Sequence, residues 1–221
     1  MSEWLTYRLS DILPFSPQTY YRLFELHNAA IWPAQLLALA AGLPILALLV
    51  SRPSWAGRAI ALLLAAIWAF VAWGYLYARY APINRAAVYF AYAFAAEAVL
   101  LALSGALGGL AFAAPRPLAA KAGLALVLFA FFVQPLIGPL LGRPWSGVEL
   151  FGIAPDPTVL ATLGVLLAAD RIRYELLAVP LLWCAVSGAT LWAMSSPEAL
   201  LMPAAGLLAL VLALWRSLGK A

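Results

Sequence analysis

Long apolar runs, separated by short polar connections, fill this chain from residue 29 to residue 214. A helix that crosses a hydrocarbon core of about 30 Å needs about 20 mostly apolar residues, because each residue advances about 1.5 Å. Most of the runs reach or approach that length. The pattern therefore predicts an all-α fold, an integral membrane bundle of about seven transmembrane helices at 29–50, 57–77, 86–113, 119–141, 158–169, 174–194 and 199–214.

The fifth run is too short for a simple span. About a dozen apolar residues lie between Asp156 and Asp170, so this helix is tilted, half-inserted or re-entrant. Asp156 and Pro157 read as a helix N-cap followed by proline at the first helical position. A re-entrant helix would instead aim Asp156 into the membrane, with Thr158 and Thr162 on the same face as further ligands. Both interpretations stay open.

The first 28 residues form a different kind of segment. They are polar and aromatic, and they lack the basic start and short apolar core of a secretory signal. Ser16 and Pro17 predict a helix start, with serine as the N-cap and proline in the first turn. We expect a single transmembrane domain over 1–221, with 1–28 as a surface or interfacial segment and 29–217 as the helical bundle.

The composition excludes several classes of protein. Apolar residues make up 66% of the chain and charged residues 10%, whereas soluble domains run at roughly half and a quarter. The single Cys184 and the single His27 leave no internal disulfide, multi-cysteine site or histidine cluster. We therefore predict no metal and no cofactor. Nucleic-acid binding needs a basic stripe with stacking aromatics, which the sequence lacks, so the expected partner is the lipid bilayer.

Lys and Arg residues set the predicted orientation. In the seven-span arrangement they fall on two sides of the membrane, and the richer side faces the cytoplasm. The count predicts a cytoplasmic C-terminus and an N-terminus outside. The richer side holds Arg52, Arg58, Arg116, Lys121, Arg171, Arg173, Arg216 and Lys220, and the other side holds Arg8, Arg22, Arg79, Arg85 and Arg143.

Glu97 lies near the middle of the third predicted span, where a charged side chain is costly and must face protein or water. Helical spacing aligns it with small and aromatic residues such as Phe94 and Ser104, a face that a neighbouring helix can approach. The functional interpretation is a proton or cation site, or a general acid. The structural alternative is an interhelical hydrogen bond from a protonated carboxyl. The sequence supports the two equally.

A polar stripe runs along the helix that leads into the first span. Glu25, Asn28, Trp32 and Gln35 follow one another at spacings of three and four residues, so they share one face. Such a face forms either a solvated vestibule or a hydrogen-bonded contact with another part of the protein. These four residues are therefore candidate ligand-lining residues.

Two further polar residues join the candidates. Asn84 follows a group of Trp and Tyr residues at one end of two helices, which is typical of an interfacial belt, with a ligand box as the alternative. Gln134 stands beside Pro135 and one turn before Pro139. Its amide either lines a ligand route or restores hydrogen bonding around a proline kink.

Several short motifs give the chain a resemblance to a known family. They are AIWPAQ at 30–35, Ile83-Asn84 with Ala86-Ala87, FGIAPDPT at 151–158, Thr162-Leu163-Gly164 and PLLW at 180–183. In their order and spacing they make the chain resemble, over nearly its whole length, a bacterial family of small multi-pass membrane proteins catalogued as a domain of unknown function (DUF6064). The resemblance implies a helical protein of the bacterial inner membrane and supplies no activity.

Three functional hypotheses follow. The first is a permease or channel-like protein that moves a small solute, ion or proton, with Glu97 as its titratable group and Asp156 on the route. The second is an accessory subunit of a larger membrane complex or a homo-oligomer, since the connections are short and no catalytic set is evident. The third is an intramembrane enzyme for a lipid-soluble substrate, with Glu97 or Asp156 as the acid. Enzymatic activity is the least favoured of the three.

Overall fold

The computed structural model describes residues 13–112 and 118–218, and within these ranges it contains helices and no strands. The predicted all-α class is therefore confirmed. The helices, in chain order, are α1 (Pro17–Ile31), α2 (Ala34–Ser51), α3 (Ala56–Phe70), the π-helix η3 (Val71–Tyr80), α4 (Ala87–Ala106), α5 (Leu118–Leu128), the π-helix η4 (Phe129–Val133), α6 (Gln134–Leu140), the short 3₁₀-helix η5 (Trp145–Gly147), α7 (Pro155–Ala168), α8 (Tyr174–Ala193) and α9 (Leu201–Leu218).

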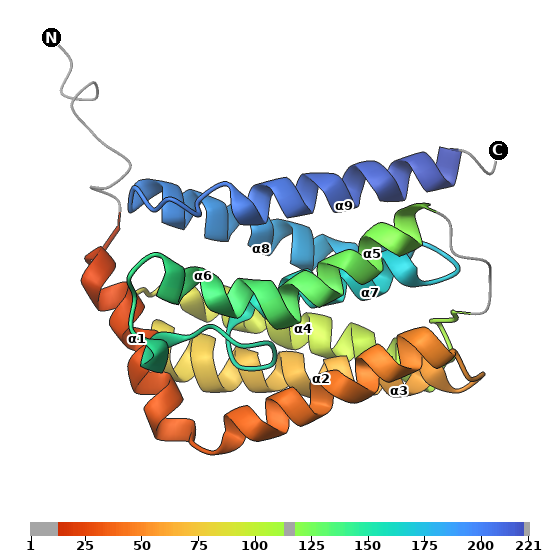
Figure 1. Cartoon of the computed structure of the whole chain (residues 1–221), viewed down its shortest axis with the longest axis horizontal. Coiled ribbons are helices and arrows are strands. Elements are labelled where there is room, and N and C mark those ends of the chain that lie inside the picture. The colour runs from red at the N-terminus through yellow and green to blue at the C-terminus, as the bar shows by residue number, and fades with distance from the viewer. Residues whose placement is uncertain (1–12, 113–117, 219–221) are drawn as a thin grey trace, which may run out of the picture.

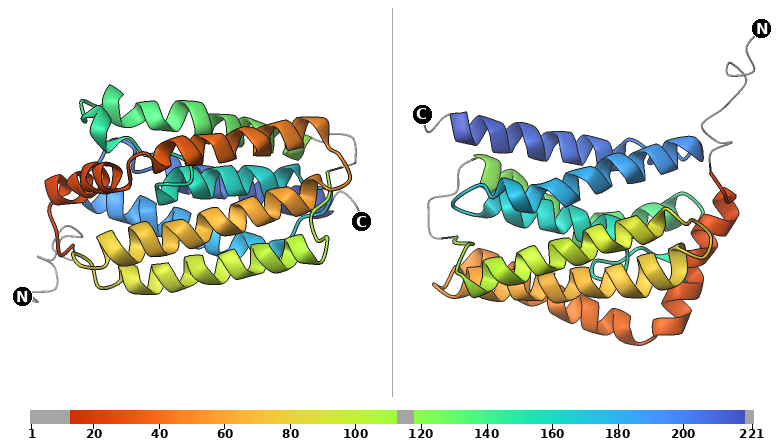
Figure 2. Two further views of the ribbon diagram at one scale, coloured as in Figure 1. Left: turned by 90° about the horizontal axis from the view of Figure 1, so that it is seen from below. Right: turned by 180° about the vertical axis from the view of Figure 1, so that it is seen from behind.

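Six helical stretches in the described residues are long and apolar enough to cross a membrane, and they lie side by side as a bundle (Figures 1 and 2). Their large outward side chains are mostly Leu, Trp, Tyr and Val, as a lipid-facing surface requires. The six are Ala34–Ser51, Ala56–Tyr80, Ala87–Ala106, Leu118–Leu140, Tyr174–Ala193 and Leu201–Leu218.

The bundle has two distinct ends. The end that we call the α1 end carries α1, which lies across the helix ends, together with the connections before α4, before α7 and before α9 (Figure 1). The opposite end, called here the far end, carries the connections before α3 and before α8 and the C-terminal turn of α9. Of the predicted interfacial segment, residues 1–12 lie outside the described residues.

The chain breaks between α1 and α2. Ser16 caps α1 as the sequence predicted, because its hydroxyl accepts a hydrogen bond from the Thr19 N–H at 3.2 Å and Pro17 occupies the first turn. Helix α1 ends at Ile31 and α2 begins at Ala34. The prediction that the first span starts at residue 29 is wrong by five residues, because Pro33 interrupts the helix there.

Helix α7 is the short fifth run, and it does not cross the bundle alone. It has only 14 residues, which at about 1.5 Å per residue is about 21 Å. Its thirteen residues from Pro155 to Leu167 are all buried, so it lies inside the bundle with helices around it (Figure 2). Residues 141–154 enter from the α1 end in irregular conformation, and α7 completes the crossing to the far end.

Close packing and polar contacts fix α7 in this place. A Cβ built on Gly123 of α5 would lie 2.4 Å from the carbonyl oxygen of Gly164, so only glycine allows these two backbones to approach. At the far end, the Arg216 guanidinium donates to the carbonyl oxygens of Leu167 at 3.1 Å, Ala169 at 2.7 Å and Asp170 at 2.7 Å. The last carbonyl oxygens of a helix have no donor within the helix, so Arg216 supplies donors at the C-terminus of α7.

Candidate functional site

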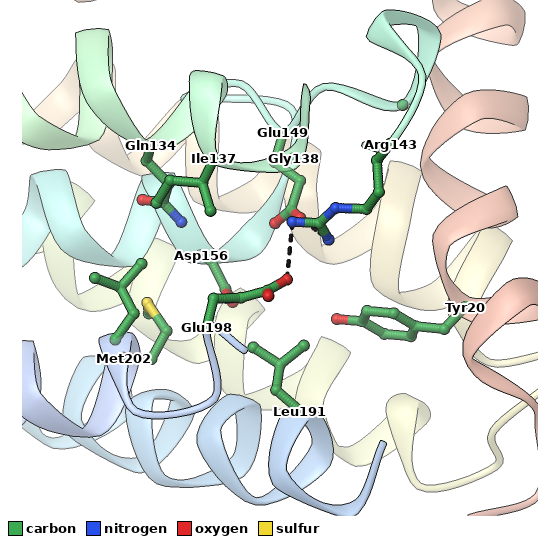
Figure 3. Close-up of a pocket in the computed structure, with 12 residues that line it drawn as sticks. Tyr20, Gln134, Ile137, Gly138, Arg143, Glu149, Asp156, Leu191, Glu198 and Met202 are labelled. Atoms are coloured by element: carbon green, nitrogen blue, oxygen red, sulfur yellow. Dashed lines mark ion pairs between the residues drawn. The ribbon is translucent and has the colours of Figure 1, made fainter. Parts of the chain in front are cut away.

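A small polar cavity lies near the α1 end, between segments that are far apart in the sequence (Figure 3). We call it the acidic cavity. It has a volume of about 20 Å³, which is room for about one water-sized occupant. It is lined by Tyr20, Gln134, Ile137, Gly138, Arg143, Gly147, Glu149, Asp156, Leu191, Glu198, Leu201 and Met202.

Asp156 enters the acidic cavity from the first turn of α7. Its side chain accepts two short hydrogen bonds from α8, one from the Trp183 indole Nε1 at 2.7 Å and one from the Ser187 hydroxyl at 2.7 Å. Trp183 is the tenth residue of the twenty in α8, so the carboxyl group lies well inside the bundle. The positive end of the α7 dipole also favours a carboxylate at this position.

Arg143, in the connection before α7, organises the opposite wall. Its guanidinium pairs with the Glu198 carboxylate at 2.8 Å, faces Glu149 at 3.7 Å and covers the ring of Tyr21 at 4.3 Å from the centroid. The Tyr21 hydroxyl in turn hydrogen-bonds the Ser196 hydroxyl at 2.6 Å and Glu198 at 3.2 Å. This network ties α1 to the segment before α9.

Glu149 is the third carboxyl group on these walls. Its carboxylate forms an ion pair with the Arg143 guanidinium at 3.7 Å, which is too long for a strong charge-assisted hydrogen bond. Arg143 therefore holds Glu149 less closely than it holds Glu198, whose carboxylate lies 2.8 Å away.

Two oxygen atoms on the walls lack hydrogen-bond partners among the described residues. They are Gln134 Oε1 and Glu198 Oε2, and both are buried. The Gln134 side chain is only 6% exposed. Buried acceptors without donors cost about 1–3 kcal/mol each, so both atoms make the walls of the acidic cavity energetically costly.

Comparison with known proteins gives the chain its family. Residues 17–221 match the model of the Family of unknown function (DUF6064). The chain belongs to this family. No curated protein and no solved structure matches the chain, so the site of this DUF6064 protein has to be read from its own geometry.

The acidic cavity of this DUF6064 protein gathers two of the predicted site residues, Asp156 and Gln134. Thr158 and Thr162 lie behind it within α7 and are fully buried. The Thr158 hydroxyl accepts from the Gly152 N–H at 3.0 Å and donates to the Ala154 carbonyl at 2.8 Å, while the Thr162 hydroxyl accepts from the Trp68 indole at 2.9 Å. Both hydroxyls therefore already have partners. Thr158 bonds to the connection before α7, and Thr162 bonds to Trp68 of α3.

The predicted polar stripe holds the α1 end together. The Asn28 amide donates to the carbonyl oxygens of Ser146 and Val148, each at 2.9 Å, and the Gln35 amide donates to the Asn28 carbonyl at 2.7 Å. Glu25 pairs with Arg22, and Trp32 is 68% exposed. The stripe therefore makes contacts with the connection before α7, and none of its four residues lines the acidic cavity.

Asn84 and Glu97 also lie apart from the acidic cavity. The Asn84 side chain accepts from the Ala86 N–H at 3.1 Å, in the turn that leads into α4. Glu97 is fully enclosed by protein, with 0% exposure, as its mid-span position required. Neither of its carboxyl oxygens has a hydrogen-bond partner among the described residues. Its role as a titratable group of the site stays a prediction.

Four lining residues with polar or charged side chains were not among the sequence candidates: Tyr20, Arg143, Glu149 and Glu198. All four lie in α1 or in connections, where charged and aromatic residues are expected from membrane topology alone. One signal was present in the sequence, since Glu149 and Glu198 are acidic residues in short connections on the same predicted side as Arg143. Their convergence depends on the way 141–154 folds back into the bundle.

Proposed function

We propose that this protein is a multi-pass inner-membrane protein that moves a small solute, ion or proton, with the crossing formed by residues 141–168 as its route. The observation that carries the proposal is the position of Asp156, a buried carboxyl group on the first turn of a helix that begins inside the bundle. Irregular backbone at membrane depth is tolerated where it is buried in protein or lines a cavity.

The surroundings of α7 support a transport role. Discontinuous helices whose N-termini point at the substrate site are a recurring device of secondary transporters. Two π-helical segments, η3 and η4, interrupt long helices of the bundle, and π-helical segments are frequent at functional sites. The π-helix η4 ends directly before Gln134, which lines the acidic cavity.

Flux measurements in proteoliposomes test this proposal. The purified chain is reconstituted and the entry of protons, Na⁺, K⁺ and NH₄⁺ is followed with trapped dyes, while swelling reports glycerol and urea. We expect flux for at least one probe above protein-free vesicles, reduced at least tenfold in Asp156→Asn. Glu25→Gln, a change of a partly exposed carboxylate on α1, should keep the flux. No flux above protein-free vesicles, or equal flux in wild type and Asp156→Asn, would overturn the proposal.

The earlier assignment of Glu97 is tested in the same vesicles. Glu97→Gln removes the charge of a fully buried carboxyl group that lies outside the acidic cavity. Lost flux would support Glu97 as a second titratable group on the route. Unchanged flux would remove Glu97 from the mechanism and leave Asp156 as the carboxyl group that serves transport.

One observation favours a second function, that of an accessory subunit of a larger membrane complex. A groove of about 560 Å³ runs between α3, η3 and α4 and is lined mainly by alanines, among them Ala65, Ala69, Ala91, Ala95 and Ala98. Small residues at such spacing let a further membrane helix approach closely. Native mass spectrometry in mild detergent tests this function. A monodisperse monomer for both the wild type and Ala95→Leu would count against a helical partner.

A further inference from the structure

A second apolar groove lies between α2 and α3, near the far end of the bundle, and we call it the α2–α3 groove. Its volume is about 570 Å³. The two helices are joined at this end by a short turn, residues 52–55 (Figure 1). On α2 the groove is lined by Pro44, Ala47 and Leu48, and on α3 its lining runs from Trp55 to Leu63. Apart from the indole N–H of Trp55, the lining side chains are apolar.

The α2–α3 groove lies on the outer surface of the bundle, where the membrane hydrocarbon surrounds the protein. Two of its lining residues, Trp55 and Leu62, are 58% and 51% exposed. From Trp55 to Leu63 the helix advances about 12 Å, at about 1.5 Å per residue. This length is most of the depth of one leaflet in a hydrocarbon core of about 30 Å. An acyl chain that enters from the headgroup level and runs along α3 therefore matches the groove.

Basic residues stand at the mouth of the α2–α3 groove. Arg52 and Arg58 lie three residues before and three residues after Trp55, whose ring belongs at the headgroup level. Arg58 is exposed, and its guanidinium has no hydrogen bond or ion pair within the described part of the chain. The sequence between Glu25 and Glu97 contains no Asp or Glu. The hairpin of α2 and α3 therefore offers these arginines no carboxylate.

The start of α3 adds to the positive potential at this mouth. The N-cap residue Trp55 gives no side-chain hydrogen bond to the first N–H groups of the helix, and a helix N-terminus favours anions. Ser54, exposed in the turn, adds a hydroxyl donor. The mouth thus offers positive charge and donors, while the groove below it offers apolar contacts. A molecule that suits both has an anionic head and an apolar tail.

A transmembrane helix would suit the α2–α3 groove less well. Close approach of two helices in a membrane requires small residues at the contact. The alanine-lined groove of α3, η3 and α4 meets that requirement, whereas Leu48, Leu62 and Leu63 narrow the α2–α3 groove and Trp55 stands at its mouth. A flexible acyl chain can fit between such side chains.

We infer that the α2–α3 groove binds one anionic phospholipid, with an acyl chain along Ala59 and Leu62 and the phosphate between Arg52 and Arg58. Basic residues beside membrane helices attract anionic lipid headgroups, and the acyl chain replaces water at the apolar walls. This inference goes beyond the proposed function and does not depend on transport.

Native mass spectrometry of the full chain in mild detergent tests the site. Dioleoyl phosphatidylglycerol and dioleoyl phosphatidylcholine are titrated separately, because they share their acyl chains and differ in headgroup charge. We expect one tightly bound lipid per chain, with phosphatidylglycerol bound at least about tenfold more tightly. Arg58→Gln should reduce this preference about fivefold. Arg85→Gln, the same loss of charge at an exposed position of the α1 end, should keep it.

Filling the groove tests where the acyl chain lies. Ala59→Phe should weaken the binding of both lipids, whereas Ala66→Phe, at an exposed position of α3 outside the groove, should bind as the wild type does. If Ala59→Phe does not fold, Arg58→Gln decides the question. Equal affinity of the wild type for the two lipids, an unchanged preference in Arg58→Gln, or the same loss in Arg85→Gln would overturn the inference. A wild-type dimer that Ala59→Phe dissociates would also overturn it, because a second copy of the chain would then occupy the groove.

Discussion

At the scale of single residues, the position of a carboxyl group decides what it can do. Asp156 is held by two short hydrogen bonds, Glu198 by a close ion pair with Arg143, and Glu149 by a longer ion pair with the same guanidinium. Hydrogen bonds to the charged form favour ionisation, while burial disfavours it. Three acids within one small cavity thereby differ in the partners that hold them.

Two kinds of residue could be recognised from the sequence alone. The first bonds to its own chain neighbours, and the second lies so deep in an apolar run that it must be buried. Ser16 was recognisable as an N-cap from its own neighbours, and Glu97 as a buried acid from its place in an apolar run. Glu149 and Glu198 carry no such mark, because a carboxylate in a connection is ordinarily solvated. Both become half-buried only because the connection before α7 folds back against the segment before α9.

At the scale of elements, the length of apolar runs predicted the spans well, and packing decided the rest. The run 174–194 became α8 at Tyr174–Ala193, and the helix continues through Pro180, as membrane helices allow. The first span moved because of Pro33, and the π-helical segments η3 and η4 left no periodic signal. The short length of α7 was visible in the sequence, whereas its burial depends on the helices packed around it, among them α5, α8 and α9.

This glycine contact can be tested directly. A Cβ on Gly123 would meet the Gly164 carbonyl oxygen at 2.4 Å and the Leu167 Cβ at 2.9 Å. A backbone carbonyl cannot rotate away, so Gly123→Val should cost at least about 2 kcal/mol of stability through overpacking. Thermal unfolding should show a clear drop in Tm. Ala125→Val, on the exposed side of the same helix, is the control, and equal Tm values for the two variants would contradict close α5–α7 packing.

At the scale of the whole molecule, six of the apolar runs become helices long and apolar enough to span a membrane, and the short fifth run becomes α7. Residues 141–168 lead from the α1 end to the far end, so the connections lie at alternate ends of the bundle (Figure 1). The α1 end accordingly holds Arg22, Arg79, Arg85 and Arg143, and the far end holds Arg52, Arg58, Lys121, Arg171, Arg173 and Arg216 (Figure 1). Sequence could not show that residues as distant as Tyr21 and Ser196 meet, since no local pattern encodes such a contact.

The surplus of basic residues at the far end gives a prediction about orientation. Positively charged connections stay in the cytoplasm, so we expect the far end inside and the α1 end outside. The chain has a single cysteine, Cys184, which is buried, and Cys184→Ser therefore gives a background without reactive thiols. On it, Ser54→Cys reports the far end and Ser146→Cys the α1 end, since both positions are exposed. A membrane-impermeant maleimide applied to cells with a permeabilised outer membrane should label Ser146→Cys at once and Ser54→Cys only after the inner membrane is opened. The reverse order would invert the topology, and labelling of both from one side would contradict the crossing by residues 141–168.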